Sequence, residues 1–360
     1  MLKVIETREI VAVVVMFLIV QFAGFLVASL TVYTSNVNIV IGRLTSPATV
    51  DLSYAIDAVL ISVLLLMLLN RHKRHGGEIW NHRLFLAFES CVIVATAFFA
   101  FLFFLTIVLP PGLQWTYLFI ALGASLLLIV LKIKTHMARN ATWIISSIGV
   151  GLVLGFYLNF KYAIIALAFL ALYDYVAVFV TKAMTKVAEK LADEDMIFLV
   201  NEEDLEAIPE KDVSAEEVAA YLSYLHETKE DKDPLFKKLL SFGRLPVITQ
   251  IEIGEGDLGL PLMAAVSIYS SFQNLFVALF TICGGAIGLM AAFWFLKRYK
   301  TPLPAIPPLF SFIAISSGIS LRVEGYISTS LLSVFVAAGI LVLVFGMVLT
   351  LSRMRKRHVI

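Results

Sequence analysis

The chain has 360 residues, of which 60% are hydrophobic and only 15% are charged. A soluble domain of this length would carry far more charge, so lipid is the expected solvent for most of the sequence. The net charge of +1 excludes the broad basic surface that nucleic-acid binding needs. Both cysteines, Cys91 and Cys283, lie inside apolar segments, which gives no support for a disulfide framework.

Apolar runs of membrane-spanning length recur along the whole chain. A bilayer core about 30 Å thick is crossed by roughly 20 apolar residues. Ten such runs lie near residues 10–31, 51–69, 84–109, 115–131, 142–158, 160–181, 256–274, 276–296, 304–320 and 327–351. The first is longer than a cleavable signal core, so we expect it to be retained. The sequence therefore predicts an all-α polytopic membrane protein. Three glycines in the fifth run, Gly149, Gly151 and Gly155, indicate close helix packing.

Lysine and arginine residues cluster at alternate ends of these spans. They precede the first span and follow the second, fourth, eighth and tenth, whereas the connections after the odd-numbered spans hold almost none. Basic loops stay in the cytoplasm, so both termini are predicted to be cytoplasmic in a multi-pass protein of the cell membrane. The predicted organisation is an N-terminal membrane half (1–182, spans one to six), a cytoplasmic loop (183–247) and a C-terminal membrane half (248–360, spans seven to ten).

The cytoplasmic loop is hydrophilic, acidic and mixed in charge. Two segments beside it, 196–200 and 247–253, are rich in β-branched and apolar residues. They are predicted as strands that pair at the membrane surface.

Asp174 is a carboxylate inside the otherwise apolar sixth span. It lies about seven residues before the end of that span, roughly 10 Å below the surface at about 1.5 Å per residue. An ionisable group in hydrocarbon costs about 2.5–3.5 kcal/mol even on lenient scales, so it needs a reason to be there. Tyr173 beside it is able to donate a hydrogen bond to a carboxylate. For Asp174, its position favours a functional role over a purely structural hydrogen bond.

Asp257 closes the sequence Gly254-Glu255-Gly256-Asp257 at the start of the seventh span. Spans six and seven flank one loop and enter from the same side, so both aspartates reach a similar depth and are able to meet. The two glycines are typical of a place where another backbone approaches closely. Two carboxyls in one low-dielectric site cannot both ionise cheaply, so the pair is expected to hold a single proton. Such a pair can activate water with one member and protonate an amide carbonyl with the other.

Four prolines lie at the start of the ninth span, within residues 301–309. Proline removes backbone donors, which leaves exposed carbonyls and extended backbone that can hydrogen-bond a substrate unwound into a strand. Prolines that merely begin a helix are the alternative.

These elements, in this order, resemble the presenilin and signal peptide peptidase family of intramembrane aspartyl proteases. The motifs that carry the resemblance are Tyr173-Asp174, Gly254-Glu255-Gly256-Asp257 and Pro304-Ala305-Ile306. The resemblance implies a presenilin-like bundle of nine transmembrane helices, here with an extra C-terminal helix. It implies that Asp174 and Asp257 are the catalytic pair, that Tyr173, Gly254 and Gly256 belong to the active-site motifs, and that Pro304, Ala305 and Ile306 bind substrate.

The resemblance also sets expectations about partners. Substrates would be transmembrane peptides in the lipid bilayer, and the modest loops are similar to those of small prokaryotic homologues, for which accessory subunits are not expected to be required. The chain departs from the family pattern at Ile306, where leucine is usual, at Glu255, and in its tenth span.

Two other classes of membrane protein share some of these features. A ten-span secondary transporter would use Asp174 and Asp257 as proton or cation sites, although the two halves of the chain show no matching repeat. Prepilin peptidases share the glycine motif but not the proline segment. His72 and His75 have a metal-like spacing, yet they lie in a basic loop without cysteines, so neither a metal nor another cofactor is expected.

Overall fold

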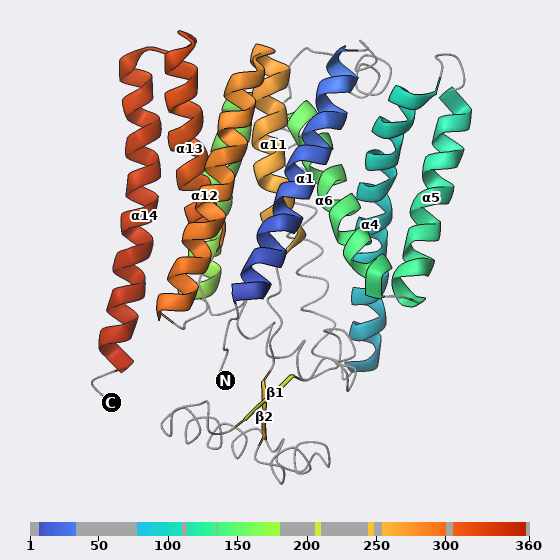
Figure 1. Cartoon of the computed structure of the whole chain (residues 1–360), viewed down its shortest axis with the longest axis horizontal. Coiled ribbons are helices and arrows are strands. Elements are labelled where there is room, and N and C mark those ends of the chain that lie inside the picture. Colours follow the sequence, from blue (N-terminus) through green and yellow to red (C-terminus); the bar gives the residue numbers. More distant parts are fainter. Residues whose placement is uncertain are drawn as a thin grey trace.

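A computed structural model describes residues 7–33, 78–109, 114–134, 136–180, 206–209, 244–247, 254–299 and 305–357. Its helices are α1 (Thr7–Tyr33), α4 (Glu78–Val108), α5 (Gln114–Lys134), α6 (His136–Tyr157), α7 (Phe160–Tyr175), α11 (Glu255–Phe272), α12 (Leu275–Tyr299), α13 (Ile306–Val323) and α14 (Thr329–Arg357). A wider π-helical turn, η2 (Val176–Val180), continues α7. The long helices stand side by side as one bundle (Figure 1).

Nine of the ten predicted spans coincide with a helix, which confirms the all-α membrane fold. The second predicted span, 51–69, lies outside the described residues. Within the described ranges, eight helices are long and apolar enough to cross a membrane. The predicted break between the fifth and sixth spans is confirmed, because Asn159 caps α7 by accepting a hydrogen bond from the backbone N–H of Lys161 at 3.4 Å.

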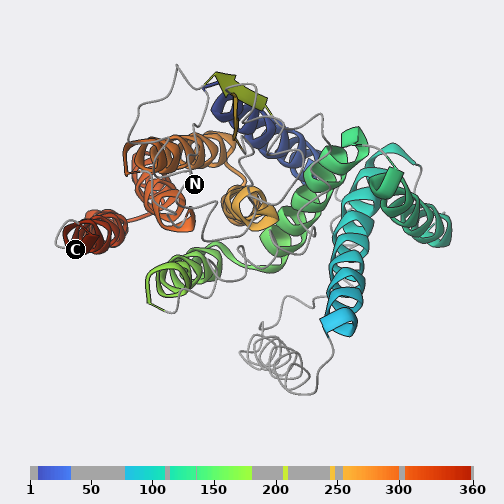
Figure 2. The same cartoon turned by 90° about the horizontal axis from the view of Figure 1, so that it is seen from below.

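Helix α11 is the centre of the bundle. Seen from below, it is surrounded by α1, α6, α7, α12 and α13 (Figure 2), and it contacts each of them. Every residue from Leu258 to Ile268 is buried. A helix enclosed by other helices is held mainly by close packing against them.

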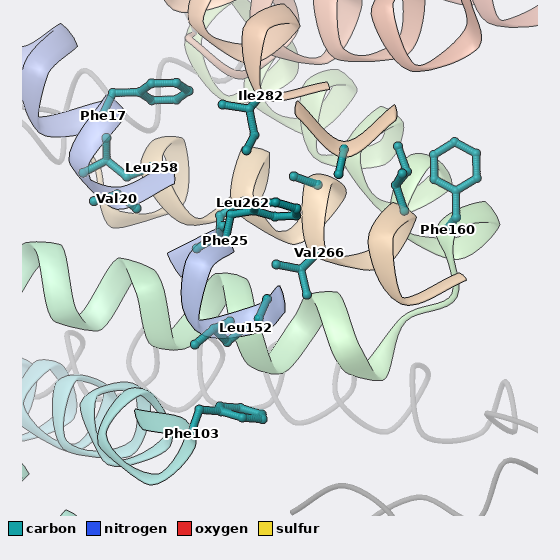
Figure 3. Packing of buried hydrophobic residues seen from close by; sticks show 14 of the residues in the cluster. Phe17, Val20, Phe25, Phe103, Leu152, Phe160, Leu258, Leu262, Val266 and Ile282 are labelled. Atoms are coloured by element: carbon teal, nitrogen blue, oxygen red, sulfur yellow. The ribbon is translucent and has the colours of Figure 1, made fainter. Parts of the chain in front are cut away.

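Small residues on the neighbouring helices allow this close packing. Side chains from α11, including Leu262 and Val266, point toward α6 and α1 (Figure 3). A Cβ at Gly151 would lie 2.7 Å from the Leu262 side chain, and one at Gly155 would lie 2.6 Å from Val266. Gly149 lies directly against the Thr96 carbonyl of α4. The close packing predicted from these three glycines is therefore confirmed.

Helices α12 and α13 pack through a pair of glycines spaced four residues apart, Gly284 and Gly288. A Cβ at Gly288 would lie 2.8 Å from both the Leu309 Cα and the Pro308 carbonyl oxygen. A Cβ at Gly284 would lie 2.7 Å from the Phe312 carbonyl oxygen. This small-residue spacing lets two helix backbones approach closely, and it sets the position of the first turn of α13.

We expect Gly288→Ala to lower the stability of the protein by about 1–3 kcal/mol, since the obstructing atoms belong to the α13 backbone and cannot rotate away. The midpoint of thermal unfolding in detergent measures this. Gly123→Ala is the matched control, because a Cβ there meets nothing within 4 Å. Equal unfolding midpoints for the two variants would contradict the assignment of Gly288 to a tight contact.

The start of α1, the end of α14 and the strand pair β1 (Glu206–Pro209) and β2 (Arg244–Val247) lie toward the same end of the bundle (Figure 1). The strands are antiparallel, with Glu206 opposite Val247. The predicted strand 196–200 lies outside the described residues, and of 247–253 only Val247 is described. The observed pair includes Pro209 and Pro246, which a two-stranded sheet tolerates because both of its strands are edges.

Candidate active site

Asp174 lies in the last turn of α7 and is 8% exposed. Its Oδ2 accepts a hydrogen bond from the backbone N–H of Ile306 at 3.2 Å. This contact joins the sixth predicted span to the start of the ninth. It therefore brings together two of the three segments that the sequence singled out.

The start of α13 explains why this hydrogen bond forms. Ala305 is the N-cap, Ile306 is the first helical residue, and Pro307 and Pro308 follow. The first N–H groups of a helix have no partner inside the helix, and proline has no N–H. The prolines thus leave Ile306 as the unpaired donor beside the cap, and the Asp174 carboxylate accepts from it. Pro304 lies outside the described residues.

Asp257 is the third residue of α11 after the N-cap Gly254. Its carboxylate is hydrogen-bonded to the backbone N–H of Gly254, and its own N–H donates to the Gly254 carbonyl oxygen at 3.0 Å. An acidic residue at this position that bonds back to the N-cap is the reciprocal arrangement of a capping box. The side chain of Asp257 is partly buried. Its orientation is thus set by the helix start that carries it.

The two carboxylates lie close enough to act on each other electrostatically. Asp174 comes from the end of α7 and Asp257 from the start of α11, and both helix ends face the side of the bundle that carries the strand pair (Figure 1). Each carboxylate accepts one backbone N–H, from Ile306 or from Gly254. The structure thus places the two carboxylates at neighbouring helix ends within electrostatic reach of each other, and their role as a catalytic pair stays a prediction.

The glycines of the motif do not make room for another described part of this chain. Gly254 has an extended backbone that any residue adopts, and a Cβ there would lie 3.6 Å from the Asp257 Oδ2, an ordinary contact. A Cβ at Gly256 would meet only Leu260, at 3.9 Å. Both glycines are exposed. Among the described residues, the space beside them is open.

Tyr173 and Tyr175 flank Asp174 and point in different directions. Tyr173 is 61% exposed and makes no hydrogen bond with a described residue, so its place in the site remains a prediction. Tyr175 is buried, and its hydroxyl donates to the Val342 carbonyl oxygen of α14 at 2.8 Å. Sequence reasoning missed Tyr175 because a tyrosine near a span end is commonly an interfacial residue.

Gln21 of α1 is a second residue that sequence reasoning missed. It is fully buried, and its Nε2 donates to the Leu258 carbonyl oxygen at 2.8 Å, one residue after Asp257. Pro261 lies inside α11 and removes the N–H that would bond the Asp257 carbonyl, so this turn is weakened and Gln21 supports it. The available signal was a lone amide within the first apolar run.

No group of three or more histidine, cysteine, aspartate or glutamate side chains gathers as metal ligands would in the described part of the chain. The site consists of two carboxylates, their backbone donors and the surrounding apolar helices. Two such carboxyls are able to take a proton from, and give a proton to, a molecule bound beside them.

Residues 14–314 match the family model described as signal-peptide peptidase, presenilin aspartyl protease. The chain belongs to this family. Asp174, Asp257 and Ile306 all fall within the matched residues, while α14 lies beyond them. Membership of the signal peptide peptidase and presenilin family supports an intramembrane aspartyl protease, which is a hydrolase, and gives no support to the transporter reading.

A solved structure titled as a presenilin family intramembrane aspartate protease is similar at 16% identity, with a TM-score of 0.49. The similarity covers 85% of this chain and 96% of that chain. The comparison with curated proteins finds no match. Together with the apolar helices, the family match identifies a multi-pass membrane protein.

Proposed function

We propose that this protein is an endopeptidase that cleaves peptide bonds within transmembrane segments, with Asp174 and Asp257 as its catalytic pair. The observation that carries the proposal is the meeting of these two carboxylates, from α7 and α11, inside a helical bundle of this family. Each is oriented by a backbone N–H from a helix start, which holds both carboxyl groups in place before substrate arrives.

The mechanism follows from two carboxyls that share one proton. The ionised member takes a proton from water as the water oxygen attacks the amide carbonyl, and the protonated member donates to the carbonyl oxygen. The resulting gem-diol then collapses: the C–N bond breaks as the carboxyl that took the proton gives it to the amide nitrogen, and the other carboxylate takes a proton back from a gem-diol hydroxyl. The surrounding apolar helices lower the local polarity, which strengthens the interactions between the carboxyls and the reacting groups.

A substrate helix must unwind before its peptide bond can reach the pair. The segment Pro304-Ala305-Ile306 at the start of α13 would contact the unwound substrate beside Asp174. The space beside Gly254 and Gly256 is open among the described residues, and it would leave room for a second backbone near Asp257. Substrates are transmembrane peptides presented from the bilayer. The predicted cytoplasmic N-terminus places the site toward the cytoplasm. Because a substrate must enter in the direction that the site can bind, this topology favours substrates whose own N-terminus is outside the cell.

The shared placement of the α1 start, the α14 end and the strand pair at one end of the bundle supports the topology predicted from basic residues (Figure 1). In this topology both termini and the loop between α7 and α11 are cytoplasmic. The chain works without accessory subunits in this proposal.

Cleavage of a single-span model peptide by the purified protein in detergent tests the function. Products detected by mass spectrometry within the apolar part of the peptide are expected. A folded protein that yields no product from several single-span peptides across a range of pH values would overturn the proposal.

A further inference from the structure

Helix α14 lies beyond the residues that match the family, yet it contacts both helices that carry the Asp174 hydrogen bond. Phe335 of α14 stacks on Phe160 at the start of α7, with ring centroids 5.9 Å apart and planes 5° from parallel. Phe345 meets Tyr175 at the end of α7, edge to face, at 5.7 Å. Helix α14 therefore holds α7 at both of its ends.

The contact at Tyr175 is also polar. The hydroxyl donates to the Val342 carbonyl oxygen at 2.8 Å, and the backbone N–H of Gly346 is hydrogen-bonded to the same phenol oxygen. In an α-helix the N–H of residue 346 faces the carbonyl of residue 342, so the Tyr175 hydroxyl lies beside one backbone hydrogen bond of α14. A Cβ at Gly346 would overlap the phenol oxygen. The absence of a side chain at Gly346 therefore leaves room for the Tyr175 hydroxyl.

The other side of α14 is fitted to α13 in the same close manner. A Cβ at Gly339 would lie 2.8 Å from the Ser311 carbonyl oxygen, and one at Gly318 would lie 2.8 Å from the Phe335 Cβ. Helix α14 consequently bridges α7, which supplies Asp174, and α13, which supplies the Ile306 N–H.

We infer that α14 is a positioning helix for the active site, and that the Tyr175 hydroxyl seated on Val342 and Gly346 fixes the end of α7 so that Asp174 keeps its place on the Ile306 N–H. This inference rests on the proposed function. Asp174 and Tyr175 are successive residues, so a rotation of α7 that displaces one displaces the other. The wider turn η2 follows at once, so the regular α-helix ends at Tyr175.

Tyr175→Phe tests the inference, because it removes the hydroxyl and keeps the ring against Phe345. The expected result is a fall in kcat of about five- to tenfold with KM changed by less than about twofold, since substrate binding is untouched and the acid is misplaced. Tyr162→Phe is the matched control. Tyr162 is on the same helix and 52% exposed, and its loss of a hydroxyl is expected to leave kcat unchanged.

Gly346→Ala disturbs the same contact from the other helix and should lower kcat in the same way. The double variant Tyr175→Phe/Gly346→Ala is expected to lose less activity than the product of the two single losses, because both remove one contact. Gly123→Ala is its control, in open space on α5.

Activity of the wild type and loss of activity in Asp257→Asn establish the proposed function separately. Given those two results, a Tyr175→Phe variant with full kcat, or one that raises KM alone, would overturn the positioning role and leave the protease intact. An inactive, folded wild type would overturn both.

Discussion

Asp257→Asn is expected to reduce the rate of cleavage of a single-span peptide by about 10²–10⁴-fold. This is the range associated with loss of an acid or base that transfers a proton in the transition state. Asparagine has the same shape but can neither take a proton from water nor donate one as a carboxylic acid does. The rate of product formation by purified protein, followed by mass spectrometry, measures the effect.

The same change should leave the fold intact. The asparagine oxygen can still accept the Gly254 N–H, so the start of α11 keeps its cap. The change also removes one of two acidic groups that cannot both be ionised cheaply, which costs no stability. We therefore expect an unfolding midpoint no lower than that of the wild type. Glu324→Gln is the matched control: Glu324 is exposed, and glutamine retains an oxygen for its bond from Asn274. Comparable cleavage by Asp257→Asn and the control would sink the catalytic assignment.

A pair of changes at Asp174 separates its chemical role from its structural one. Asp174→Asn keeps an oxygen that can accept the Ile306 N–H, whereas Asp174→Ala leaves that donor without a partner at the start of α13. Both are expected to abolish cleavage, by about 10²-fold or more. Only the alanine variant should lose stability, by about 0.5–2 kcal/mol, which is the usual cost of losing a helix cap.

Parallel measurements of peptide cleavage and thermal unfolding in detergent check this separation. Equal loss of stability in both variants would mean that the hydrogen bond to Ile306 contributes nothing to the fold. Retained cleavage in Asp174→Asn would show that the carboxylate is a cap of α13 and not a catalytic group.

The membrane fold and the two aspartates could be predicted from the sequence because their signals are local. An apolar run of about 20 residues has one low-energy state in a bilayer, a helix whose backbone hydrogen bonds are satisfied internally. A carboxylate inside such a run, as at Asp174, stands out by its cost alone. The order of segments along the chain also placed Asp174 and Asp257 at the same end of neighbouring spans. The glycines of the fifth span predicted close packing for the same local reason.

The strands could not be placed from the sequence in this way. Their signal was alternation in a charged loop, and the pair found at 206–209 and 244–247 contains two prolines and little alternation. A two-stranded pair is stabilised mainly by cross-strand contacts between segments distant in the chain, so local pattern says little about where it forms.

Composition and pattern by themselves determined that this chain is a helical membrane protein with two carboxylates at one level of the bundle. Only the tertiary structure decided what each of them touches. Asp174 bonds a backbone donor 132 residues away, Tyr175 a carbonyl 167 residues away, and Gln21 a carbonyl 237 residues away. Such contacts depend on how helices approach across the bundle, and that approach is set by packing of the glycine-lined faces of α6, α12 and α14 together with all their neighbours. No short stretch of sequence contains that information.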